Sequence, residues 1–225
     1  MDKRQGYAEL IAKRKACHLC DSHGLTNPSV CRGGVYDANG HIGPWSGWQG
    51  NLDAELMVVA QDWGGVEYYI EHKGLEEDTN TTNRRVCELL SSIGISIELP
   101  RQSRNSVLFF TNSVLCLRPG RLTEPIKSQW FRNCSTNFLR PQVELVKPKV
   151  IVTLGYMAYR ALLSAYEIRP KQRMREAVQE TMPLPSGSAL VPVYHPGNNG
   201  SRSRSFEHQK ADWQRVRQAL DRKLN

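Results

Sequence analysis

Four short apolar runs, separated by segments with helical periodicity, constrain the fold of this chain most strongly. Each run is rich in β-branched or aromatic residues, and together they cover residues 55–60, 107–112, 149–154 and 189–194. The helix-like segments are 4–16, 81–94, 125–146, 156–166 and 205–223. Alternation of this kind is typical of a parallel sheet with helices on both faces. We therefore expect an α/β fold, a three-layer α/β/α sandwich around a central four-stranded parallel sheet.

The length, charge and hydropathy of the chain limit its class and its partners. A chain of 225 residues can form one domain over residues 1–225, in which the Gly-, Pro- and Trp-rich stretch 17–50 is irregular. No apolar run reaches the roughly 18 residues that span a bilayer, and Met1–Lys15 lacks an apolar signal core. A cytoplasmic protein without a membrane partner is therefore expected. The net charge of +8 favours a polyanionic partner.

Polar residues follow three of the predicted strands at the point where each strand ends. The residues that follow the four runs are Gln61-Asp62, Asn112-Ser113, Gly155-Tyr156 and Tyr194-His195-Pro196. Ligands of parallel sheets bind at the carboxyl ends of the strands, so Asp62, Asn112 and His195 are expected to share one site. Taken singly, each has a structural alternative, because Asp and Asn also cap helices and a histidine can lie in a core.

The six cysteines indicate a metal site rather than a set of disulfides. Cys17 and Cys20 form a Cys-x-x-Cys pair in the irregular segment, and Cys116 and Cys134 follow later in the chain. Four such thiolates suit zinc or an iron–sulfur cluster, and a redox-active pair is the alternative for Cys17 and Cys20. Cys87 falls on an apolar helical face and is expected in the core, whereas Cys31 could replace one of the four ligands.

Several short motifs, in one order along the chain, give a resemblance to a known family. They are Cys17-x-x-Cys20, the segment 50–57, Ala60-Gln61-Asp62-Trp63-Gly64, the segment 111–119, Cys134 with 138–142, the segment 148–155 and His195-Pro196. Together they resemble the uracil-DNA glycosylase superfamily, in particular its iron–sulfur branch. The motif at the end of the first strand is a hybrid: Gln61-Asp62 resembles the metal-free uracil-DNA glycosylases, and Gly64 resembles the iron–sulfur branch.

The resemblance implies roles for individual residues. It implies a [4Fe-4S] cluster on Cys17, Cys20, Cys116 and Cys134, catalysis by Asp62 and His195, and binding of uracil by Asn112 and the main chain of Gln61. Gly64 stands where metal-free members have the tyrosine that excludes thymine. The usual stacking aromatic falls near Thr82, so Tyr68 or Tyr69 is the expected substitute.

The loop after His195 is the expected DNA contact. It contains Arg202 and Arg204, which suit phosphates, although a solvated basic loop is the alternative.

The expected function is that of a monofunctional uracil-DNA glycosylase. Such an enzyme flips uracil, the product of cytosine deamination, out of DNA and hydrolyses its N-glycosidic bond, which initiates base excision repair. Uracil-containing DNA is the expected partner of a monomeric, nucleoid-associated protein. The alternatives are a non-catalytic iron–sulfur nucleic-acid-binding module of the same fold, or a zinc or redox protein. Neither alternative needs Asp62, Asn112 and His195 together.

Overall fold

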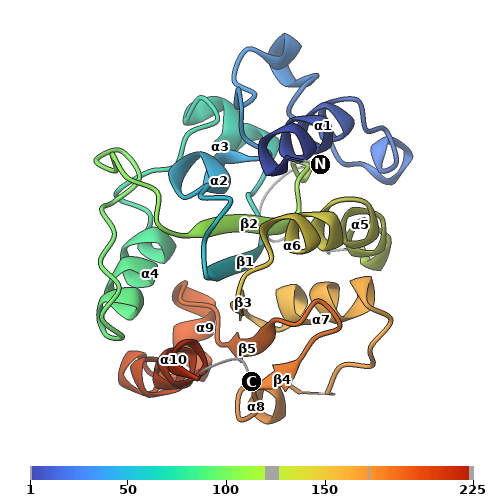
Figure 1. Ribbon diagram of the computed structural model, residues 1–225. Coiled ribbons are helices and arrows are strands. Elements are labelled where there is room, and N and C mark those ends of the chain that lie inside the picture. Colours follow the sequence, from blue (N-terminus) through green and yellow to red (C-terminus); the bar gives the residue numbers. More distant parts are fainter. Residues whose placement is uncertain (1, 120–126, 172, 223–225) are drawn as a thin grey trace.

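The sheet at the centre of the computed structural model has five strands, in the order β2-β1-β3-β5-β4 (Figure 1). The structure describes residues 2–119, 127–171 and 173–222. The strands are β1 (Leu56–Asp62), β2 (Phe109–Val114), β3 (Val150–Leu154), β4 (Met182–Pro183) and β5 (Ala189–Val193). Strands β1, β2, β3 and β5 are parallel and correspond to the four predicted runs.

The predicted four-stranded parallel sheet needs one correction, because β4 adds a fifth strand at the edge. It pairs antiparallel with β5, with Met182 opposite Leu190 and Pro183 opposite Ala189. Two residues are too few to show a hydrophobic period, and proline is tolerated at a sheet edge. The sequence pattern therefore could not reveal this strand.

Two layers of helices cover the sheet and produce the expected sandwich (Figure 1). On one face α1 (Lys3–Lys15), α6 (Arg140–Val146) and α7 (Tyr156–Ala165) pack against alternate strand residues such as Met57 and Phe109. On the other face α2 (Pro44–Trp48), α4 (Thr81–Ser91) and α10 (Phe206–Asp221) pack against Val58 and Phe110. Successive side chains of a strand point to opposite faces, which explains this division.

The helix predicted over 125–146 is interrupted by a wider turn. Residues 125 and 126 lie outside the described residues; α5 (Ser128–Cys134) continues into a π-helical turn (Ser135–Leu139) and then into α6. Pro141 has no N–H to donate to the preceding turn, which favours a local departure from α geometry. The remaining helices are α3 (Val66–Glu71), α8 (Met174–Ala177) and α9 (Asn198–Ser203), with 3-10 turns at Asp21–His23 and Cys31–Gly34.

The stretch 17–50 is largely irregular, as predicted, and buried polar side chains hold it in place. Asn27 donates from Nδ2 to the carbonyl oxygens of Arg14, at 2.8 Å, and Cys17, at 2.9 Å. The Arg14 guanidinium makes a two-pronged bond to the Asp37 carboxylate, with both side chains at most 5 % exposed. Near its end the stretch forms α2, where the ring centroid of Trp45 lies 5.1 Å from that of Phe110 in β2. No helix in the described ranges is long and apolar enough to cross a bilayer.

Candidate active site

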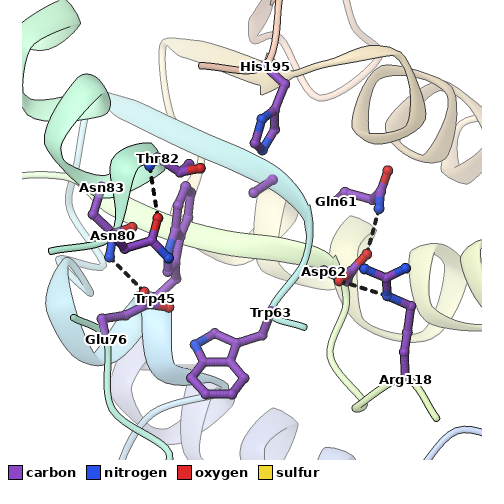
Figure 2. Close-up of a pocket in the computed structure, with 11 residues that line it drawn as sticks. Trp45, Gln61, Asp62, Trp63, Glu76, Asn80, Thr82, Asn83, Arg118 and His195 are labelled. Carbon is purple, nitrogen blue, oxygen red and sulfur yellow. Dashed lines mark hydrogen bonds and ion pairs between the residues drawn. The ribbon is translucent and has the colours of Figure 1, made fainter. Parts of the chain in front are cut away.

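A pocket of about 320 Å³ opens beyond the carboxyl ends of β1 and β5 (Figure 2). The end of β1 supplies Gln61, Asp62 and Trp63 to its lining, and the start of α4 supplies Thr82 and Asn83. Its other lining residues are Trp45, Ala60, Glu76, Asn80, Arg118 and His195. The topology of the sheet explains why these residues lie together, because the carboxyl ends of parallel strands meet at the same edge of the sheet.

The Asp62 carboxylate is fixed by two neighbours. Arg118 Nε donates to its Oδ1 at 3.2 Å, and Gln61 Nε2 donates to its Oδ2 at 2.6 Å. The Asp62 and Arg118 side chains are each only 5 % exposed, so this is a buried ion pair. The pair orients the carboxylate. Sequence reasoning assigned no role to Arg118, because nothing local marks a residue of another strand as its partner.

The environment of His195 selects a neutral imidazole with its proton on Nε2. The Gly197 N–H donates to Nδ1 at 3.0 Å, so the neutral ring must carry its proton on Nε2. Burial lowers the pKa of His195 below its ordinary 6.5, and the negative charge of Asp62 partly opposes this. A Cβ at Gly197 would come 2.9 Å from the ring atoms Cε1 and Nδ1, which explains the glycine there.

Asn112 lies in the sheet beside the pocket. It pairs with Ala60 of β1 and is 3 % exposed, and its Oδ1 has no hydrogen-bond partner. Strand alternation places it on the face that carries Phe110, against which Trp45 packs. Buried amide oxygens are rarely left unpaired, so this oxygen is available to a ligand. The three predicted residues are thus brought to one region: Asp62 and His195 line the pocket, and Asn112 adjoins its wall.

The two tyrosines predicted to contact the base do not line the pocket. Tyr68 and Tyr69 lie in α3, and each ring centroid is 5.2 Å from that of Trp63. Tyr69 is buried, while the Tyr68 hydroxyl accepts from Asn80 Nδ2 at 3.3 Å. The aromatic walls of the pocket are instead Trp63 and Trp45. Trp63 directly follows β1, whereas Trp45 lies in the irregular stretch and carries no sequence signal.

The two arginines after His195 have different environments. Arg204 makes a two-pronged bond to the buried carboxylate of Asp212, at 3.0 and 2.8 Å, and therefore anchors the loop to α10. Arg202 lies in α9 and is exposed. Of the two arginines predicted to contact phosphates, Arg204 is therefore bound to a carboxylate, and Arg202 presents its side chain to solvent.

The four cysteines predicted to bind metal line one cavity. Cys17, Cys20, Cys116 and Cys134 converge from the irregular stretch, the loop after β2 and the end of α5. Cys31 packs instead with Tyr69 and Leu117, and Cys87 packs against the core below α4. Among the residues described, no group of three His, Cys, Asp or Glu side chains is spaced to hold a single metal ion.

The fold and this pocket define an α/β protein whose site is built at the ends of parallel strands. Residues 48–217 match the family model of the Uracil DNA glycosylase superfamily, and the chain belongs to that superfamily. The resemblance stated from the sequence motifs is thereby confirmed.

Two curated relatives are similar over most of their length. A Type-4 uracil-DNA glycosylase from Archaeoglobus fulgidus is 24 % identical over 176 residues, which cover 77 % of this chain and 81 % of the relative. A Type-4 uracil-DNA glycosylase from Thermotoga maritima is 26 % identical over 203 residues, which cover 87 % and 84 %. Neither comparison tests the role of the Gln61-Asp62 motif, which stays a prediction.

The pKa of His195 provides a direct test of this geometry. We expect NMR titration of its ring protons to give a pKa below 6.5, because burial disfavours the charged imidazolium. In Asp62→Asn the pKa should fall further, since the opposing negative charge is lost. Asp53→Asn, a surface change near Lys3, should leave it unchanged. A rise in the pKa of His195 in Asp62→Asn would contradict the proximity of the two side chains.

Proposed function

We propose that this protein is a uracil-DNA glycosylase, which accepts uracil flipped out of DNA and hydrolyses its N-glycosidic bond. The observation that carries the proposal is a buried carboxylate and a neutral imidazole at one pocket. Cleavage produces a uracil anion and an oxocarbenium-like sugar, so both charges need stabilisation. The non-catalytic and the zinc or redox alternatives leave this pair unexplained.

His195 is suited to the uracil anion and Asp62 to the sugar. The Nε2–H of a neutral His195 donates a hydrogen bond to a uracil carbonyl oxygen, and this bond strengthens as negative charge develops there. The Asp62 carboxylate stabilises the cationic sugar and orients the attacking water. Its oxygens keep lone pairs beyond the bonds from Arg118 and Gln61, so a water can still donate to it.

Recognition of the base is assigned to Asn112 and the aromatic walls. The free Oδ1 of Asn112 accepts from uracil N3–H, and its amide donates to O4, a pattern that cytosine does not match. Trp45 and Trp63 supply the stacking surface that the sequence suggested for Tyr68 or Tyr69. Base flipping costs a few kcal/mol, and stacking of the extruded base offsets part of that cost.

A [4Fe-4S] cluster on Cys17, Cys20, Cys116 and Cys134 is the second part of the proposal. Two sulfurs already accept N–H bonds at 3.3 Å, Cys134 from the main chain of Leu115 and Cys20 from Asn133. Arg14 lines the same cavity, and its buried Nε has no partner, so an acceptor-rich cluster fits this donor. When bound, the cluster would cross-link the irregular stretch to β2 and α5.

Contact with DNA is assigned to Arg202 and to the positive balance of the chain. A net charge of +8 favours association with the phosphate backbone, whatever its sequence. We place the protein in the cytoplasm, associated with the nucleoid, and acting as a monomer formed by the single domain 1–225.

The catalytic pair is tested by single-turnover kinetics on uracil-containing oligonucleotides. We expect His195→Ala to lower the rate of excision on the order of 100- to 1,000-fold, the usual effect of losing one preorganised donor. Asp62→Asn should lower the rate strongly while DNA affinity stays near the wild-type value. Asp53→Asn serves as the control. Full activity of Asp62→Asn would remove this residue from the mechanism.

The cluster is tested by colour and by metal content. Protein produced with sufficient iron should be brown and contain about four irons per chain. Replacing Cys17, Cys20, Cys116 or Cys134 by Ser should bleach it, because each would supply one ligand. Replacing Cys31 or Cys87, which lie outside the cavity, should leave the colour intact. Colourless protein with one zinc per chain would exclude the cluster.

The two loop arginines should separate DNA binding from stability. Arg202→Ala should weaken binding to all sequences alike and reduce the dependence of affinity on salt, since it removes a phosphate contact. Arg204→Ala should lower the melting temperature instead, because it leaves the buried Asp212 without a bidentate partner. A loss of affinity confined to uracil-containing DNA in Arg202→Ala would argue against a phosphate contact.

A further inference from the structure

A second carboxyl group, that of Glu76, lies in the wall of the pocket. Glu76 belongs to the loop between α3 and α4 and is 6 % exposed. Asn83 Nδ2 donates to its Oε2 at 2.8 Å, and the indole groups of Trp63 and Trp45 also interact with the carboxyl. Figure 2 shows Glu76 and Asn83 on one side of the pocket and Gln61, Asp62 and Arg118 on the other. Glu76 therefore faces Asp62 across the pocket.

Unlike Asp62, Glu76 has no cation as a partner. No Lys, Arg or His of the described ranges forms an ion pair with its carboxyl; Arg101 donates to its main-chain oxygen and pairs with the neighbouring Glu77. Burial raises the pKa of Glu76 to about 7. Hydrogen bonds from Asn83, Trp63 and Trp45 partly oppose this rise, and the charge of Glu77 adds to it. Below that pH the carboxyl is protonated and can donate a hydrogen bond.

A purely structural role does not explain a carboxyl group at this position. The second N–H of Asn83 already donates to the Glu77 carbonyl oxygen at 3.0 Å, so α4 is anchored independently of Glu76. A glutamine would accept the bond from Asn83 equally well without the cost of burying an ionisable group. Buried carboxyls in pockets with perturbed pKa values are typical of functional sites.

We propose that Glu76 is a specificity-determining residue whose protonated carboxyl donates a hydrogen bond to O4 of the flipped uracil. The assignment rests on the proposed function, because His195 and Asp62 then hold the sugar side of the base and its remote edge meets the opposite wall. O4 can accept from both Asn112 and Glu76, since a carbonyl oxygen has two lone pairs. Cytosine carries an amino group in place of O4 and offers no acceptor there.

The proposal predicts that excision of uracil is lost on the alkaline side. An ionised Glu76 would repel O4, so the rate should fall as pH rises through about 7, by up to about tenfold per pH unit. The other charged or titratable groups around the carboxyl are Tyr36, His41, Asp62, Tyr68, Glu77, Arg101, Arg118 and His195. The pKa values of His41, His195 and Glu77 are all lowered, so these three titrate on the acid side of Glu76.

The variants Glu76→Gln, Glu76→Ala and Glu77→Gln separate this role from a general effect of charge. Single-turnover excision of uracil is measured with saturating enzyme between about pH 6 and pH 8.5. Glu76→Gln, a permanent donor, should match wild type within a few-fold at pH 6 and keep its rate at pH 8.5. Glu76→Ala should be slower at both values, and Glu77→Gln should follow wild type. An alkaline loss that persists in Glu76→Gln, or a wild-type rate in Glu76→Ala, would overturn the proposal.

Binding of the free bases keeps this test separate from that of the proposed function. Trp45 and Trp63 line the pocket, so quenching of tryptophan fluorescence reports uracil or cytosine without any catalysis. Uracil should bind wild type more weakly at pH 8.5 than at pH 6 and bind Glu76→Gln equally at both. A protein that binds in this way but excises no uracil would refute the glycosylase and retain Glu76 as a reader of O4. Absence of uracil binding at pH 6 would overturn the assignment of Glu76.

Thermal unfolding gives a check that does not depend on any ligand. A carboxyl with a raised pKa contributes stability that is present below its unfolded pKa and is lost as pH rises through the folded value. Between about pH 5 and pH 8 the melting temperature of wild type should therefore fall relative to that of Glu76→Gln. A difference that does not change with pH would show that the buried carboxyl is not held protonated, which contradicts the proposal.

Discussion

The parallel pairing of β1 with β2 and β3 is the constraint on which the rest of the molecule depends. The first five residues of β1, Leu56–Ala60, are buried and apolar, and the first polar side chains of that strand, Gln61 and Asp62, come at its carboxyl end. The same register that buries the core sets Ala60 beside Asn112, and β5, parallel to β3, delivers His195 to the same edge. The polar groups of the site are thus gathered by the pairing that hides the apolar ones.

The two carboxyl groups of the pocket, those of Asp62 and Glu76, have different surroundings and therefore different proposed roles. Asp62 is buried and forms an ion pair with Arg118. Glu76 is buried with amide and indole neighbours but no cation, and burial then favours the neutral form. A pocket that gives one acid a cationic partner and leaves the other without one can use the first as a charge stabiliser and the second as a hydrogen-bond donor. The Arg118 guanidinium, which pairs with Asp62 and not with Glu76, therefore distinguishes the roles of the two acids.

The sequence predicted the parts of the structure that follow from local periodicity and topology. The four parallel strands, both helical layers and the meeting of Asp62 with His195 depend on patterns within single segments and on where strands end. Arg118, Trp45 and Glu76 could not be predicted, because their roles arise from contacts between distant segments. Tyr68 and Tyr69, which were predicted to contact the base, lie away from the pocket for a related reason. Helix α3 directs Tyr69 into the core, and Trp63 lines the pocket instead.

Trp45, proposed to stack on the base, comes from the end of the cysteine-containing stretch 17–50 and so connects that stretch with the base pocket. The family resemblance led us to expect the stacking aromatic near Thr82, and the indole of Trp45 from α2 lines the same pocket as Thr82. Helix α2 closes the stretch 17–50, whose path is fixed by Arg14, Asn27 and Asp37 beside the four cysteines. A short helix of five residues cannot hold Trp45 by its own hydrogen bonds. The path of residues 17–50 therefore delivers Trp45 to the pocket wall, where it packs against Phe110 of β2, although no cysteine reaches the pocket itself.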